Sequence, residues 1–255
     1  MPSWLESFSP KTFDDLAVPK RIRVALSSSS VTADPPHLLL TGPPGVGKTA
    51  AWKLVARQIL GPGWKATTHV LQCRDLARQS GAMAKFENFL RPGGSTDTLA
   101  GRTSLEAFDR GMAARSEGDK APAGFETKLE AGSIPVSRLI VLEDADHLGS
   151  IRQAYLRRMM EKVGNASRFI LVARAPSRII DALRSRSRMI RIPATEREQI
   201  VQTLASIAEI SNSNATQEVM EDVAYICDGN LRKAIFTLEM LDSRNLGADR
   251  SAVHK

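Results

Sequence analysis

The stretch "HLLLTGPPGVGKTAAWKLVARQILG", residues 37–61, decides the fold of this chain. It begins with an aliphatic run, continues through a turn rich in glycine and proline, and ends in a segment whose apolar residues have helical spacing. The turn contains the pattern G-x-x-x-x-G-K-[ST] at Gly42, Gly47, Lys48 and Thr49. A strand before this pattern and a helix after it distinguish a phosphate-binding loop from a chance glycine turn. The stretch therefore predicts a nucleotide-binding α/β fold.

The predicted loop binds phosphate mainly through its backbone. Glycines allow consecutive N–H groups to turn toward an anion, and the N-terminus of the following helix adds positive potential. In this pattern the lysine, here Lys48, reaches the outer phosphates, and the hydroxyl of Thr49 binds magnesium. We predict that the nucleotide is bound by Gly42, Pro43, Pro44, Gly45, Val46, Gly47, Lys48 and Thr49.

Other short apolar runs have the length and flanking residues of buried parallel strands. They are "THVLQC" (68–73), "RLIVLE" (138–143) and "RFILVAR" (168–174), with a helical pattern in "SIRQAYLRRMMEKVG" (150–164). Strands that alternate with helices predict a parallel sheet. Before the first strand, residues 12–26 predict an arm and an amphipathic helix, which we expect to end in a loop at "SSSSVTADPP", residues 27–36.

The chain is predicted to consist of two domains, 1–193 and 194–255. After Pro193 the strand pattern does not recur, and helical spacing over 194–210, 215–227 and 230–243 predicts a small three-helix domain. We interpret the segment 91–133, which is rich in Gly, Ser, Ala and charge, as an insertion with one short helix around Ser104 to Ala114.

Carboxylates follow the apolar run 138–143 directly, in "EDAD". In nucleotide hydrolases a strand beside the phosphate loop ends in an acid that holds magnesium, and an adjacent acid activates the attacking water. Glu143 and Asp144 stand at these two positions. We predict Glu143 and Thr49 as metal ligands and Asp144 as the base; the alternative is a strand end with solvated or helix-capping carboxylates.

Composition limits the partners and the compartment. The 255 residues include 35 Lys and Arg against 28 Asp and Glu, and the net charge of +7 indicates either a polyanionic partner or a basic surface that only aids solubility. Cys73 and Cys227 form no metal or disulfide motif, so we expect reduced thiols. No signal peptide and no apolar run near ~18 residues is present, which predicts a soluble intracellular protein without a membrane partner.

These motifs, in this order, resemble the small subunit of replication factor C, the archaeal and eukaryotic clamp loader of the AAA+ ATPases. The resemblance includes an N-terminal arm with tryptophan, and it lies in the segments 4–16, 37–49, 139–161, 168–193 and 229–241. It implies an AAA+ P-loop NTPase domain followed by a three-helix lid, with ATP and Mg²⁺ as cofactors. Implied partners are other clamp-loader subunits in a hetero-oligomeric ring, a sliding clamp and primer-template DNA. The implied compartment is the cytoplasm in a prokaryote and the nucleus in a eukaryote.

The resemblance also implies roles for arginines outside the phosphate loop. Ser185-Arg186-Ser187 matches the family's Ser-Arg-Cys motif, so Arg186 is the implied arginine finger for a neighbouring subunit's ATP, and Arg232 is the implied lid contact with the same subunit's nucleotide. An arginine suits the finger because it is always charged and offers a rigid fork of donors. The arginines in the regions that track DNA phosphates are Arg152, Arg157, Arg158 and Arg178. A solvated basic face is the alternative for these arginines.

Two departures from the family predict weak hydrolysis. The family has Asp-Glu where this chain has Glu143-Asp144, so the carboxylate of the base is withdrawn by roughly 1 to 1.5 Å. A displacement of about this size costs on the order of a hundredfold in rate. Arg174 replaces an asparagine that orients the attacking water, and it either favours bound triphosphate or pairs with Asp144 and removes its basicity.

The likeness does not extend into the helical collar that follows the lid in the family. We expect ring assembly to rest on AAA+ contacts or on partners, unless the chain is truncated by design. Two alternatives to a clamp-loader subunit remain open. One is a catalytically inert nucleotide-binding scaffold or regulatory subunit of an AAA+ ring, and the other is an AAA+ remodeller of DNA junctions or of another protein.

Overall fold

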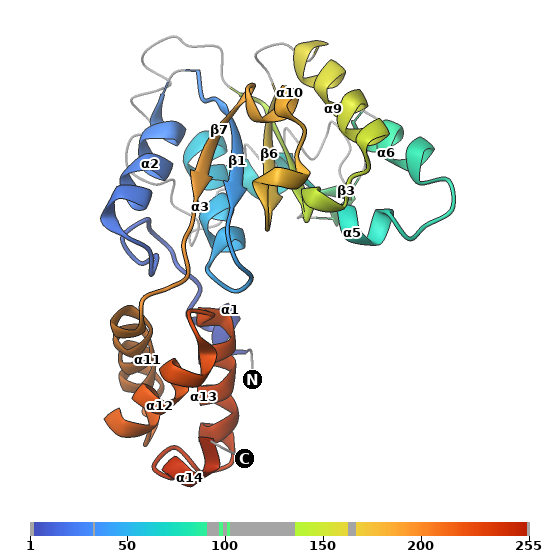
Figure 1. Ribbon diagram of the computed structural model, residues 1–255. Coiled ribbons are helices and arrows are strands. Elements are labelled where there is room, and N and C mark those ends of the chain that lie inside the picture. The colour runs from blue at the N-terminus through green and yellow to red at the C-terminus, as the bar shows by residue number, and fades with distance from the viewer. Residues whose placement is uncertain are drawn as a thin grey trace. The chain divides into compact units, whose positions relative to one another are not determined.

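The computed structural model describes residues 3–32, 34–90, 97–98, 101–102, 136–162 and 167–253 (Figure 1). They form two compact units. The first comprises Val24–Thr41 and Trp52–Arg191, and the second comprises Met1–Arg23, Gly42–Ala51 and Ile192–Lys255. The predicted helix around Ser104 to Ala114 and most of the segment 91–133 lie outside the described residues. The division of the chain at residue 193 stays a prediction.

The elements of the first part of the chain begin with two helices and the first strand. They are α1 (Trp4–Ser7), α2 (Lys20–Val31), β1 (His37–Thr41), α3 (Lys48–Leu60), η1 (Gly61–Gly63), α4 (Trp64–Thr67), β2 (Thr68–Gln72), α5 (Cys73–Leu76), α6 (Ala82–Leu90), β3 (Asp97–Thr98) and β4 (Gly101–Arg102). The later elements are β5 (Arg138–Glu143), η2 (Ala145–His147), α9 (Ser150–Lys162), β6 (Ser167–Ala173), η3 (Pro176–Arg178), α10 (Asp181–Arg184), β7 (Ser187–Arg191), α11 (Arg197–Ser211), α12 (Gln217–Cys227), α13 (Leu231–Ser243) and α14 (Arg250–Val253).

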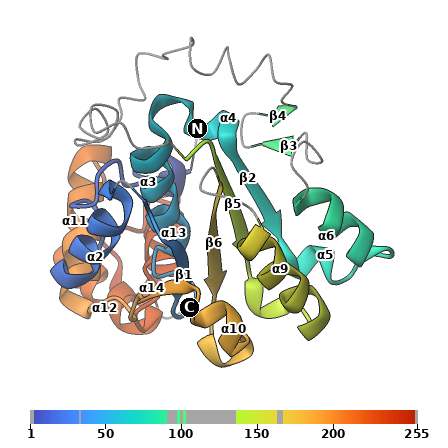
Figure 2. The same ribbon diagram turned by 90° about the horizontal axis from the view of Figure 1, so that it is seen from above.

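The main sheet confirms the predicted parallel α/β fold. Its order is β2-β5-β6-β1-β7, and every neighbouring pair is parallel. In register, Leu39 pairs with Leu171 of β6 and Met189 of β7. Helices α5, α6, α9 and α10 share a buried cluster with β1, β5 and β6, and Figure 2 shows α3 on the other side of the sheet. Because the strands are parallel, β1, β5 and β6 all end at one edge.

The predicted loop at 27–36 is wrong over its first half, because α2 continues through the serine run to Val31. The hydroxyls of Ser28 and Ser29 donate to the carbonyl of Ala25 at 3.2 and 2.6 Å, and Ser30 donates to the carbonyl of Ser27 at 2.8 Å. Ser29 and Ser30 are also buried. Serines that bond to carbonyls one turn earlier remain compatible with a helix.

Strand β7 was not predicted. Its sequence, "SRMIR", buries only Ile190, and the other four residues are exposed or half-buried. A strand with one buried residue at the edge of a sheet carries little apolar periodicity. The sheet therefore gains a fifth strand that the pattern of apolar runs did not indicate.

The C-terminal helices form the predicted helical region with an additional short helix, α14. Helices α11, α12 and α13 lie close to the predicted ranges and share one buried apolar cluster. Capping side chains fix two of the helix starts: Thr216 Oγ1 accepts from the N–H of Val219 in α12, and Asn230 Oδ1 accepts from the N–H of Lys233 in α13. These local capping bonds therefore define the starts of α12 and α13.

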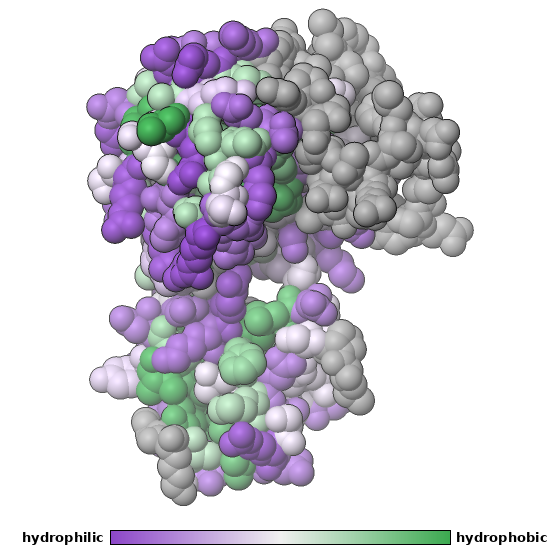
Figure 3. All heavy atoms as spheres, turned by 90° about the vertical axis from the view of Figure 1, so that its right-hand side faces the viewer, coloured by the Kyte–Doolittle hydropathy of each residue, from purple (hydrophilic) through white to green (hydrophobic). Residues whose placement is uncertain are grey.

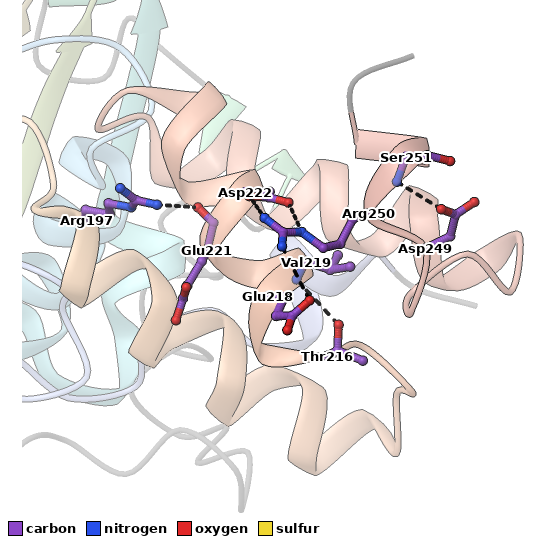
Figure 4. A network of polar contacts seen from close by, with 9 residues as sticks. All are labelled: Arg197, Thr216, Glu218, Val219, Glu221, Asp222, Asp249, Arg250 and Ser251. Carbon is purple, nitrogen blue, oxygen red and sulfur yellow. Dashed lines mark hydrogen bonds and ion pairs between the residues drawn. The ribbon is translucent and has the colours of Figure 1, made fainter.

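An arginine joins α14 to α12 (Figure 4). Arg250 Nε and Nη2 donate to the two carboxylate oxygens of Asp222 at 2.7 and 2.9 Å, and Nη1 lies 3.4 Å from Glu218. Two parallel N–H···O bonds fix both the distance and the plane of the pair. The contact therefore orients α14 on the surface of α12.

The surface of the helical region is mixed. Figure 3 shows apolar side chains among polar ones in its lower part, and Ile210, Tyr225 and Phe236 are among the large apolar residues exposed in this region. Within the described ranges, the structure contains no helix that combines the length and apolar character needed to cross a membrane.

Candidate nucleotide-binding site

The phosphate loop, residues 42–47, is shaped by its glycines. Gly42, Gly45 and Gly47 have φ values of 147°, 76° and 92°, which L side chains rarely adopt. A Cβ atom at Gly42 would lie 2.0 Å from the backbone oxygen of Ile192, and a Cβ atom at Gly45 would lie 1.7 Å from Asn230 Oδ1. Side chains are thus excluded by neighbouring atoms at two positions and by backbone conformation at all three.

Lys48 folds back over this loop. Its Nζ donates to the carbonyl oxygens of Gly42 at 2.7 Å and Pro43 at 2.5 Å. The ammonium group is therefore held at the loop, on the first residue of α3, where the helix N-terminus also carries positive potential. Thr49 follows on the same helix turn, as the pattern requires for a hydroxyl that binds magnesium.

The start of α13 is attached to the loop. The N–H of Arg232 donates to the carbonyl of Gly45 at 3.0 Å, and the side chain of Asn230 lies where a Cβ atom of Gly45 would be. The predicted lid residue Arg232 thus contacts the loop through its backbone, while its side chain is exposed. Asn230 was not among the predicted site residues. Its contact with the loop joins segments nearly 200 residues apart, which local patterns do not indicate.

The predicted acids follow the buried part of β5. Glu143 is the last residue of the strand, and Asp144 adopts a left-handed conformation with φ 51° and ψ 43°. Aspartate tolerates this region better than most residues. Trp52 Nε1 on α3 donates to Glu143 Oε1 at 2.6 Å. Both side chains lie in the sheet unit, so this contact anchors the predicted metal ligand to α3.

Arg174 follows β6, the neighbour of β5. Its backbone N–H lies 3.4 Å from Asp146 Oδ1, and its side chain is exposed. In the part of the chain that the structure describes, no ion pair joins Arg174 to Asp144, one of the two arrangements considered above. Arg174 therefore contacts the acidic edge, which consists of Glu143, Asp144 and Asp146, through its backbone and not through its side chain.

The pKa of the Cys73 thiol responds to the negative charge of the acidic edge. Burial is the main cause that raises the pKa of its thiol, and the negative charge of Asp144 raises it further, while Arg152 acts in the opposite direction. Asp146 and Glu143 add smaller contributions of the same sign as Asp144. The acids therefore gather near Cys73, and Arg152 partly compensates their charge.

The donor set fits a magnesium ion that is carried by a nucleotide. No group of three or more His, Cys, Asp or Glu side chains within the described ranges is arranged to hold a metal ion. Magnesium does not need such a cage, because it usually keeps several waters and binds one or two carboxylates together with substrate phosphates. Glu143 and Asp144 supply the oxygen ligands that this ion prefers.

Arg186 lies after α10 and has a partner within the chain. Its Nη2 lies 2.6 Å from Glu161 Oε1 of α9, and its Nη1 donates to the carbonyl of Ala182 at 2.9 Å. Arg157 Nε lies 3.7 Å from the same Glu161 oxygen. All three charged side chains are partly exposed to solvent. The predicted finger is therefore held by an accessible ion pair, which a stronger anion can replace.

The four arginines predicted to bind DNA do not share one environment. Arg157 and Arg158 are exposed on α9, and Arg178 is exposed at the end of η3. The buried Gln153 connects α9 to η3, because its Nε2 donates to the carbonyl of Arg178 at 2.9 Å. Arg152 is half-buried and its charge acts on the acidic edge instead. DNA binding by these residues stays a prediction.

Curated relatives of this chain are subunits of replication factor C. Replication factor C subunit 5 of Schizosaccharomyces pombe is 32% identical over 246 residues, which cover 96% of this chain and 66% of the relative. Replication factor C small subunit of Methanoculleus marisnigri is 28% identical over 236 residues, 92% of this chain and 62% of the relative. The chain thus spans less than two thirds of the length of these relatives.

Solved structures support the fold. The RuvB Holliday junction branch migration motor of Thermotoga maritima matches with a TM-score of 0.60 at 15% identity, over 97% of this chain and 71% of that chain. The model of the family described as "ATPase family associated with various cellular activities (AAA)" matches residues 38–197, more than half of the 255 residues. With the phosphate loop, the parallel sheet and this match in agreement, the chain belongs to the AAA family of ATPases.

Proposed function

We propose that this protein is an ATP-binding subunit of a DNA clamp loader of the replication factor C type. In this role it joins other subunits in a ring that opens a sliding clamp and places it on primed DNA. The observation that carries the proposal is the similarity to replication factor C subunits over 92–99% of the chain. The intact phosphate loop supports the nucleotide part of this role.

ATP binding follows from the loop. Backbone N–H groups of residues 42–47 and the ammonium group of Lys48 are assigned to the phosphates, and Thr49 and Glu143 are assigned to magnesium. Bound magnesium would neutralise charge between the outer phosphates. Arg232, at the start of α13, is assigned to the nucleotide of the same subunit. Each of these assignments can be tested separately by substituting the residue concerned.

Hydrolysis is expected to be weak. Asp144 is one methylene shorter than the glutamate of the family, so the reach of its carboxylate toward an attacking water is limited. Arg174 provides no neutral side chain to align this water. A slow subunit still contributes to a ring, because Arg186 is available to act on the ATP of a neighbour once it leaves Glu161.

The test is ATP turnover by the purified chain, alone and with primed DNA and a replication factor C partner subunit, beside Asp144→Glu and Arg174→Asn. We expect a wild type that binds ATP, turns it over slowly, and gains on the order of a hundredfold in the double variant. A wild type as fast as the double variant would show that Asp144 is an adequate base. The clamp-loader role itself is tested by measuring whether the complex of this chain with the partner subunit binds a sliding clamp.

A second candidate is a catalytically inert subunit that serves as a scaffold or regulator in an AAA ring. The exchange of Glu143 and Asp144 and the presence of Arg174 favour it. The intact Lys48 and Arg186 favour the first proposal. Turnover that stays undetectable in every assembly, together with tight ATP binding, identifies the inert subunit.

A further inference from the structure

Glu143 is one methylene longer than the aspartate that the replication factor C pattern has at this position. In the structure this longer side chain reaches Trp52, whose Nε1–H donates to Oε1 at 2.6 Å. Trp52 is only 2% exposed and lies on α3, three residues after Thr49. A buried donor therefore fixes one oxygen of the predicted magnesium ligand.

The chemistry of this pair restricts the acid. An indole N–H can only donate, and an ionised carboxylate can only accept. The separation of 2.6 Å is short for an N–H···O hydrogen bond. The bond also fixes the rotation of the Glu143 carboxylate, because Trp52 is packed into the core and its ring cannot follow a moving partner.

We propose that Trp52 is a positioning residue for the magnesium ion of the bound nucleotide. It holds the Glu143 carboxylate in one orientation, so that a longer acid serves where the family has a shorter one. Trp52 acts only through Glu143 and touches neither metal nor nucleotide. The inference rests on the proposed ATP-binding function of the same site and names a side chain on which its magnesium affinity depends.

Partners that orient a metal ligand typically change metal affinity by about 10- to 100-fold. We expect about a tenfold effect for one neutral N–H donor. Trp64 provides a matched control. It is 3% exposed, and its buried Nε1 donates no hydrogen bond within the described residues. Replacing either tryptophan by phenylalanine keeps an aromatic core residue, but only Trp52→Phe removes an interaction with an acid.

The first experiment measures binding of a fluorescent non-hydrolysable ATP analogue to the full chain as magnesium is titrated. Trp52→Phe should raise the magnesium midpoint about tenfold and leave binding in EDTA unchanged. Trp64→Phe should change neither value. An unchanged midpoint in a folded Trp52→Phe variant would overturn the proposal.

A double-mutant cycle tests whether the effect passes through Glu143. Aspartate at position 143 is too short to reach the indole, so Trp52→Phe should have no further effect on the magnesium midpoint in an E143D background. If the two substitutions instead multiply their effects, Trp52 acts by packing alone and the proposal fails.

A measurement on the native tryptophans covers the case in which Trp52→Phe does not fold. In ¹H–¹⁵N spectra of the wild type, the Trp52 indole cross-peak should lie downfield of that of Trp64, and E143Q should move only the Trp52 signal. A Trp52 signal that E143Q does not move would overturn the contact. If the wild type binds no nucleotide in any condition, the proposed function and the inference both fail, whereas equal magnesium midpoints in wild type and Trp52→Phe refute the inference alone.

Discussion

The phosphate loop and the acidic end of β5 obtain their geometry in different ways. The loop depends on backbone: positive φ angles, the backbone oxygen of Ile192 beside Gly42, and the N–H of Arg232 on Gly45. The acidic end depends on side chains, because Glu143 is held by an indole. The two regions belong to different compact units, and each is stabilised within its own unit.

This difference separates binding from turnover. Backbone N–H groups present the same donors whatever the side chains are, so a loop of this kind retains phosphate binding while other residues change. A base and a water-orienting group act through side-chain length, and a change of one methylene moves the reacting oxygen. A chain can therefore retain the first property and lose most of the second.

The largest effect is expected when a side chain is placed inside the phosphate loop. Gly42→Ala would place a Cβ atom 2.0 Å from the backbone oxygen of Ile192, where no side chain can move away. We expect a loss of about 3 kcal/mol or more in the free energy of unfolding, together with loss of ATP binding. Urea denaturation and calorimetric titration with ATP measure the two effects.

Gly81→Ala is the control for Gly42→Ala. Gly81 also has a positive φ, 67°, but its Cβ atom would meet nothing within 4 Å. We expect this variant to lose only about 1 to 2 kcal/mol. Equal losses in both variants would show that the contact with Ile192 does not shape the loop.

In the sheet unit, protonation of a buried side chain should change the free energy of unfolding. Burial, and secondarily Arg168, lowers the pKa of His37 on β1 from 6.5 to about 4, and its Nδ1 accepts from the N–H of Phe169 at 3.1 Å. The unfolded chain therefore binds more protons between these two pH values. The contribution, at most about 3 kcal/mol, is complete above pH 6.5 and is lost as pH falls toward 4.

The pH dependence is checked by urea denaturation of wild type and His37→Asn between pH 4 and 7. His37→Asn should flatten the slope of the unfolding free energy against pH. Parallel slopes in wild type and His37→Asn would contradict the assignment.

Lys48, the first residue of α3, tests how much a charged side chain adds to the backbone donors of the loop. Removing its hydrogen bonds to a phosphate anion should weaken ATP binding by about 10- to 100-fold in Lys48→Ala, with little change in stability. Lys53→Ala, at an exposed position on the same helix, should bind ATP as the wild type does. A Lys48→Ala variant with wild-type affinity would mean that backbone donors alone carry the phosphate site.

The smallest effect is expected where a side-chain contact is exposed. Glu161→Gln removes the ion pair with Arg186, and because both groups are accessible the loss in stability should be below about 1 kcal/mol. Glu218→Gln, whose partner Arg250 keeps Asp222, should behave similarly. A loss above about 2 kcal/mol in thermal or urea denaturation would identify the pair as part of the core.

Local patterns were sufficient where one segment determines its own structure. The apolar runs of β1, β5 and β6, the helical spacing of the C-terminal region and the glycine-rich turn before α3 were predicted from neighbouring residues. The prediction of a loop at the serine run was wrong over its first half, because the serine hydroxyls bond to carbonyls within the helix. Composition alone does not distinguish this outcome from a loop. Strand β7 lacks the apolar periodicity that marks the others.

The contacts that position the site were beyond sequence reasoning for a physical reason. Trp52 and Glu143 are 91 residues apart, and Asn230 meets Gly45 only after the chain has folded. Such pairs depend on register and on rotamers, which periodicity does not specify. The position of the glycine-rich loop between a strand and a helix was therefore predictable, and the support of the acidic residues was not.

The two cysteines offer a practical route to following this protein in motion. Cys73 and Cys227 are buried, and burial raises the pKa of both thiols, so maleimides should leave them unmodified in the native state. A cysteine introduced in place of the exposed Tyr225 and another in place of the exposed Ile151 would then take fluorescent dyes selectively. Energy transfer between these dyes, recorded on single molecules with and without ATP, would show whether nucleotide changes the distance between the sheet unit and the helical region.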